Sequence, residues 1–203
     1  MSFKKVIYFL IIVSLGTYLY LAVPYLVQLT RYYSLSGSGM KYALNNGGDL
    51  DPKILTVKPV SERFGLVITK LGLNKKVQKE VDYFDQEKLV TSLKIGLAHL
   101  KNSGLPGGFG TMVIIGHPLD TLFNFPHTNP DFYLINKLTE GDQVTVFYNG
   151  AELTYRVVSC RIEDEDYLDF FDPGSQKKLL LVSGYPPGLA YKLLVVEALQ
   201  LDN

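Results

Sequence analysis

The apolar positions of the chain fall into one long run near the start and a series of short runs from residue 64 onward. Residues 6–27 are almost unbroken apolar and aromatic sequence, and about 20 such residues in a helix cross a bilayer core of about 30 Å. Lys4 and Lys5 precede the run and tyrosines crowd its far end, a pattern typical of a cytoplasmic flank and an outer aromatic belt. No small-x-small cleavage site follows, and the run is long for a signal peptide. We therefore predict an uncleaved anchor over residues 1–33 rather than a cleaved signal peptide.

This anchor predicts a single-pass protein of the cell membrane, with a cytoplasmic N-terminus and an extracytoplasmic globular part. Residues 34–60 are predicted to be a juxtamembrane linker, because residues 34–53 are rich in Gly, Ser, Asn and Asp. The remaining residues, 61–203, are predicted to form one globular domain.

The short apolar runs of this domain alternate with turn residues, which is typical of β-strands. Gly72 separates two such runs, and Asn149 with Gly150 is the strongest hairpin signal in the chain. Helical spacing is limited to FYLINKLTEGD and to KLVTSLKIGLAHL, which is either a short amphipathic helix or a packed loop. Seven or eight short strands with one or two short helices predict a mainly β fold, a closed or nearly closed barrel.

Composition excludes several classes of protein. Lys and Arg number 20, as do Asp and Glu, so the formal charge is zero and no basic excess attracts nucleic acid. Cys160 is the single cysteine, which excludes an internal disulfide framework and a multi-cysteine zinc site. No cofactor is predicted.

An acidic cluster offers one metal hypothesis. Its carboxylates could bind a hard cation such as calcium through oxygen atoms, although their spacing lacks the EF-hand pattern. A solvated loop is the simpler interpretation, and we predict no metal site. The residues concerned are Glu163, Asp164, Glu165 and Asp166.

The order of motifs is more informative than any one of them. TMVIIGH is followed by NKLTEGD, by QVTVFYNGAELTYRV, and by LLLVSGYPPG with a cation before LLVV. This order resembles the sortases, membrane-anchored transpeptidases of the bacterial envelope with a β-barrel fold. The resemblance implies that a cysteine thiolate attacks a sorting motif of Leu-Pro-x-Thr-Gly type and forms an acyl-enzyme that an amine resolves. A histidine then protonates the leaving amine, and an arginine stabilises the oxyanion.

The resemblance assigns roles to individual residues. His117 falls on the family histidine, while Gly184 stands where the family has its cysteine and Lys192 where it has its arginine. The loop before Lys192 is one residue shorter than in the family. Ser183 and Tyr185 flank the nucleophile position and, together with His99 in the segment that leads to His117, are assigned to substrate binding. Two of the three catalytic positions are therefore changed.

Three hypotheses follow. In the first, the chain is a catalytically degenerate transpeptidase that binds a sorting-signal peptide or an envelope partner, because glycine cannot form an acyl intermediate. In the second, it is an active transpeptidase that uses a non-standard nucleophile, or one from which the natural cysteine has been removed. In the third, it is a purely structural envelope barrel, since fold does not fix function. The first is the prediction.

Overall fold

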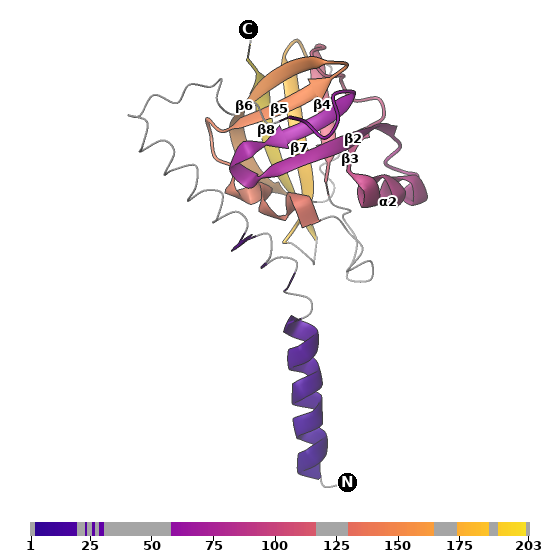
Figure 1. The fold of residues 1–203 in the computed structure, drawn as a ribbon, viewed down its shortest axis with the longest axis vertical. Coiled ribbons are helices and arrows are strands. Elements are labelled where there is room, and N and C mark those ends of the chain that lie inside the picture. Colours follow the sequence, from indigo (N-terminus) through magenta and orange to yellow (C-terminus); the bar gives the residue numbers. More distant parts are fainter. Residues whose placement is uncertain are drawn as a thin grey trace, which may run out of the picture.

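The computed structural model describes residues 3–19, 23, 26, 29–30, 58–116, 130–164, 174–186 and 191–201. Residues 3–19 form a helix (Figure 1). Most of its large apolar side chains are exposed. Within these described ranges, no helix combines the length and the apolar character that a membrane crossing needs. The anchor over residues 1–33 stays a prediction.

Eight strands in the described residues close into a barrel in the order β1-β2-β3-β4-β7-β8-β6-β5 (Figure 1). The prediction of a mainly β, closed barrel is confirmed. Neighbouring strands are antiparallel except for β2 with β3 and β4 with β7. The strands are β1 Phe64–Ile68, β2 Leu73–Val81, β3 Leu97–Leu100, β4 Gly110–Ile115, β5 Gln143–Tyr148, β6 Ala151–Glu163, β7 Lys177–Tyr185 and β8 Lys192–Gln200.

Short helices join some of these strands. The segment that the sequence left as a helix or a loop divides into helix α2, Gln86–Ile95, and strand β3. Asp85 caps α2 by accepting a hydrogen bond from the N–H of Lys88. Leu89 and Leu93 of α2 pack on the outside of the barrel, where the helix lies against β2 and β3 (Figure 1). The remaining helices are the 3-10 helices η2, Thr69–Leu71, and η3, Pro130–Lys137.

The strands bury apolar side chains on both faces, because successive residues point to opposite sides of a strand. On β7, Leu179 and Leu181 belong to the inner core, whereas Leu180 and Val182 belong to a second core on the outer face, which also receives α2. Strand β8 alternates in the same way, with its even-numbered residues inward and its odd-numbered residues outward. Burial on both faces explains why these strands read as unbroken apolar runs in the sequence.

Helix η3 covers part of the inner core and fixes the end of β4. Phe132 of η3 is fully buried, and its ring occupies the space where a side chain on Gly116 would lie. Any Cβ at residue 116 would collide with this ring, so the close approach of η3 to the end of β4 requires glycine.

Candidate functional site

Four of the predicted site residues meet at one end of the β7–β8 pair. Ser183 lies opposite Leu194, Gly184 opposite Leu193, and Tyr185 opposite Lys192. Directly opposed residues of antiparallel strands have Cβ atoms about 4.5–5.5 Å apart. The structure therefore brings the positions 183, 184, 185 and 192 together at the start of the β7–β8 connection.

These residues do not share one face of the sheet. Ser183 follows Leu181 in the alternation and belongs with the inner face, as Lys192 does with Leu194. A side chain at position 184 would project to the outer face, beside Leu193. The candidate nucleophile position and the candidate cation therefore lie on opposite sides of the β7–β8 pair.

The register of β8 against β7 accounts for this arrangement. Because side chains alternate with a period of two, a change of one residue in the loop moves the next side chain to the other face. The apolar residues of β8 fix its register against β7, since Leu193 must face the outer core and Leu194 the inner core. Lys192 is thus left on the inner face, and Leu193 takes the place beside position 184.

Lys192 is held by the carboxylate of Asp164, the residue that follows β6. Its Nζ lies 2.8 Å from Oδ1 of Asp164, and the hydrogen bond and the charge of Asp164 raise the pKa of Lys192. The ammonium is therefore protonated at neutral pH. Asp164 is 82% exposed and Lys192 42% exposed, so solvent screens the pair and it contributes little to stability. No motif in the sequence indicates this pairing, which depends on the β6–β8 register.

Ser183 has an unusual environment for a serine. It is 1% exposed, and its hydroxyl has no hydrogen-bond partner within the part of the chain that the structure describes. Buried hydroxyls in proteins are nearly always bonded. The neighbouring Tyr185 is half-buried against the inner core.

His117 and His127 lie outside the described residues. The described chain before His117 ends at Gly116, whose N–H donates to the carbonyl of Val182 at 3.2 Å. Val182 is two residues before Gly184 on β7, so the segment that leads to His117 runs beside the candidate nucleophile position.

His99 lies in the barrel interior and is fully buried. Its ring contacts Phe64 of β1, the N–H of Glu80 on β2, and the β3–β4 loop at Ser103 and Gly104. Strand β4 lies between His99 and the β7–β8 pair. The structure thus places His99 apart from the other candidate residues.

Two of the four acidic residues pair with cationic side chains of the protein. Glu163 accepts a hydrogen bond from Nε of Arg161 at 2.8 Å, Asp164 pairs with Lys192, and Glu165 and Asp166 lie outside the described residues. Across the described ranges, no group of three or more His, Cys, Asp or Glu side chains is placed to hold a metal ion.

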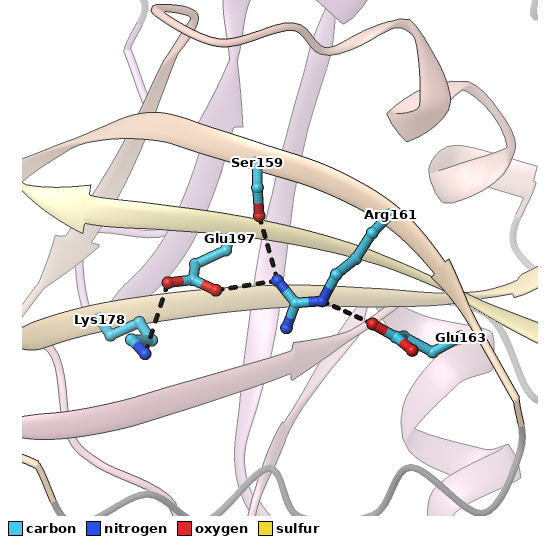
Figure 2. Close-up of polar contacts among 5 residues, drawn as sticks. All are labelled: Ser159, Arg161, Glu163, Lys178 and Glu197. Atoms are coloured by element: carbon cyan, nitrogen blue, oxygen red, sulfur yellow. Dashed lines mark hydrogen bonds and ion pairs between the residues drawn. The ribbon is translucent and has the colours of Figure 1, made fainter.

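A polar network crosses the outer face of β6, β8 and β7 (Figure 2). Nη1 of Arg161 donates to Ser159 and to Glu197, and Nζ of Lys178 lies 3.4 Å from Glu197. Burial alone would raise the pKa of Glu197, but the hydrogen bonds and charges of Arg161 and Lys178 outweigh burial and lower it. Sequence reasoning missed this network, because no motif marks residues that meet only through strand pairing.

The thiol of the chain lies elsewhere on the sheet. Cys160 is exposed and lies opposite Val196 on the β6–β8 ladder, so its side chain is on the same face as that inner-core residue. Desolvation raises the pKa of its thiol. Strand β8 separates it from β7. A side chain at position 184 points to the other face, so Cys160 does not supply a thiol there.

A family model described as the sortase domain matches residues 66–200. The chain belongs to the sortase family. Sortase D of Bacillus subtilis (strain 168) is 29% identical over 122 residues, which cover 60% of this chain and 53% of that protein. The chain therefore spans about half the length of that sortase relative.

Solved sortase structures share the barrel. A Clostridium perfringens Sortase D5 transpeptidase matches with a TM-score of 0.57 and 18% identity, over 69% of this chain and 79% of that chain. A lid mutant of sortase A from Corynebacterium diphtheriae matches with a TM-score of 0.56 and 24% identity, over 70% and 72% of the two chains. Both comparisons show the sortase fold, and the family prediction made from the order of motifs is confirmed.

Proposed function

We propose that this sortase-family chain is a membrane-anchored extracytoplasmic protein with a degenerate transpeptidase centre, and that it binds a sorting-signal peptide without covalent chemistry. The observation that carries the proposal is the chemistry of position 184. Glycine occupies it, and Cys160, the single cysteine of the chain, lies on β6 and on the opposite face.

Oxyanion stabilisation is weakened as well. Lysine lacks the planar fork of donors that arginine offers to a carbonyl oxygen. Lys192 also lies on the inner face and is paired with Asp164, whereas a nucleophile at position 184 would point outward. Two separate changes therefore oppose acyl transfer, and each follows from a described residue.

Peptide binding is proposed because the fold around this site is kept. The family model covers residues 66–200, and β7 and β8 stay paired as far as Tyr185 and Lys192. The unpartnered hydroxyl of Ser183 and the half-buried Tyr185 are the proposed contacts.

The proposed anchor is the apolar segment near the start of the chain. Residues 3–19 are helical and expose large apolar side chains such as Phe9 and Ile12, which favours a surrounding lipid phase over water. Deletion of residues 1–33 is expected to release the protein from the membrane fraction. Retention of the shortened chain would contradict the anchor and leave the peptide-binding proposal untouched.

Mass spectrometry after incubation with a Leu-Pro-x-Thr-Gly peptide and an amine acceptor tests the chemistry. We expect neither a covalent adduct nor a transpeptidation product, while calorimetry with the same peptide reports binding. Turnover by the unchanged chain would overturn the proposal in favour of an active transpeptidase. Absence of both turnover and binding would favour a structural barrel instead. Gly184→Ala is the matched control for Gly184→Cys, because it adds a side chain at this position without a nucleophile.

A further inference from the structure

The imidazole of His99 is bonded at both of its nitrogens inside the barrel. Nδ1 accepts the N–H of Glu80 at 3.2 Å, so Nδ1 carries no proton. The hydrogen-bond network therefore assigns the proton of the neutral ring to Nε2, which lies 2.9 Å from the carbonyl oxygen of Gly104 and 3.0 Å from Oγ of Ser103.

The two sides of the ring connect different parts of the sheet. Glu80 has a φ of 56° and lies where the β2–β3 register shifts, between Gln78 and Val81. At such an irregularity a residue leaves the regular ladder, and here the N–H of Glu80 is bonded to the ring of His99. His99 thus holds the irregular part of β2 against β3.

On its other side the ring reaches β4 through the β3–β4 loop. Oγ of Ser103 donates to the carbonyl of Leu100 at 2.7 Å and accepts the N–H of Val113 at 3.3 Å. The N–H of Gly104 donates to the carbonyl of Thr111 at 2.7 Å. A displacement of the ring would therefore affect β2, the loop and β4 together.

We infer that His99 is an acid-sensitive clasp, which joins the irregular part of β2 to the β3–β4 loop at neutral pH and releases it when the ring takes up a second proton. A proton from solvent that binds Nδ1 turns the only acceptor of the ring into a donor. Nδ1–H then faces the N–H of Glu80, and two donors cannot share one hydrogen bond. The new positive charge also lies in a buried site, which is unfavourable without a close counter-charge.

The charged groups near the ring are few. The charges of Glu80 and Lys79 on β2 change the pKa of His99 in opposite directions. The other strands contribute uncharged groups: β1 the ring of Phe64, at 5.5 Å between centroids, and β4 the residue Ile114 opposite His99. Burial lowers the pKa of His99, and this effect outweighs the carbonyl of Gly104 and the charge of Glu80, which raise it. The clasp is therefore closed at neutral pH and opens below the ordinary histidine pKa of about 6.5.

Nitrogen-15 NMR of the full chain in detergent micelles, at pH values from 7.5 to 4.5, tests this inference. We expect an unprotonated Nδ1 at pH 7.5 and a titration of the ring below about 6.5. Hydrogen exchange should show the protection factors of the Glu80 and Val113 amides falling at least tenfold over the same range. A protonated Nδ1 at pH 7.5, or protection that stays constant while the ring titrates, would overturn the clasp.

Two variants complete the test. His99→Asn keeps an acceptor for the N–H of Glu80 but has no group that titrates in this range, so the pH step in protection should disappear. His127→Asn removes a different histidine and should keep the step. If His99→Asn does not fold, the measurements on the unchanged chain still decide the matter. None of these outcomes depends on peptide binding, so the inference stands apart from the proposed function.

Discussion

Replacement of Ser183 by alanine is expected to stabilise the protein. Ser183 is 1% exposed and its buried hydroxyl has no partner within the described part of the chain, and such burial costs about 1–3 kcal/mol. The gap left by the oxygen, on the order of 10 Å³, costs only about 0.2 kcal/mol at about 24 cal/mol per Å³. The net gain is about 1–2.5 kcal/mol. It corresponds to a rise in Tm of about 3–8 °C, at about 3 °C per kcal/mol.

Thermal and urea unfolding measure this gain directly. The midpoint of urea unfolding should rise at an unchanged m-value, since the surface exposed on unfolding is nearly the same. Ser103→Ala is the matched control, because the same atom is removed from a hydroxyl that bonds to Leu100, Val113 and His99. That variant should lose about 1–3 kcal/mol. Equal effects of the two substitutions, or a loss of stability in Ser183→Ala, would refute the argument from the missing partner.

A gain in stability would also bear on the role of Ser183. Binding sites commonly keep groups that destabilise the free protein. If the hydroxyl contacts a peptide, as proposed, Ser183→Ala should unfold at a higher temperature and bind the Leu-Pro-x-Thr-Gly peptide more weakly. Tighter binding by the more stable variant would exclude that contact.

Three further predictions follow from the site and the fold. Gly184→Cys is expected to form a covalent adduct with the peptide. Addition of Lys192→Arg to this variant should not raise turnover, because residue 192 lies on the inner face. A large gain in turnover from the second change would contradict the assigned register. Gly116→Ala should lower the free energy of unfolding in urea by at least about 2 kcal/mol, since the new Cβ would overlap the ring of Phe132. Phe132→Leu in the same chain should recover part of that loss. An unchanged stability of Gly116→Ala alone would rule out the close contact. The lowered pKa of Glu197 gives stability that is present above the unfolded-state pKa of about 4.3 and is lost as the pH falls through the folded-state pKa. The Tm of Glu197→Gln should therefore fall less steeply than that of the unchanged chain over acidic pH. An equal slope of Tm against pH in both proteins would count against the ion pairs.

The barrel could be predicted from the sequence because its strands are short apolar runs between turn residues. The prediction was less detailed where two kinds of structure join, as at residues 86–100, where one apolar segment contains both α2 and β3. Leu89 and Leu93 have helical spacing, and the following Leu97 and Leu100 continue it closely enough to hide the boundary at Gly96.

The site was harder to predict, because its geometry depends on strand register. The motif order located Ser183, Gly184 and Lys192 at one end of two strands, but it contained no information on which face each side chain takes. That face is set by the whole length of β8, whose residues must match both cores. Glu197 of β8 meets Arg161 of β6 and Lys178 of β7 only in the folded barrel, and Lys192 meets Asp164 in the same way, so no local pattern announces these pairs.

The position of the last strand has a consequence for the way the chain folds. Strand β8 is the last of the described strands in chain order, yet it lies between β7 and β6 in the barrel. Until it inserts, β6 and β7 each present an unpaired edge, and such edges readily pair with other chains. Contacts between distant segments, such as β1 with β5, also slow folding. We therefore expect a slow, late closing step during which the newly made protein depends on protection from aggregation.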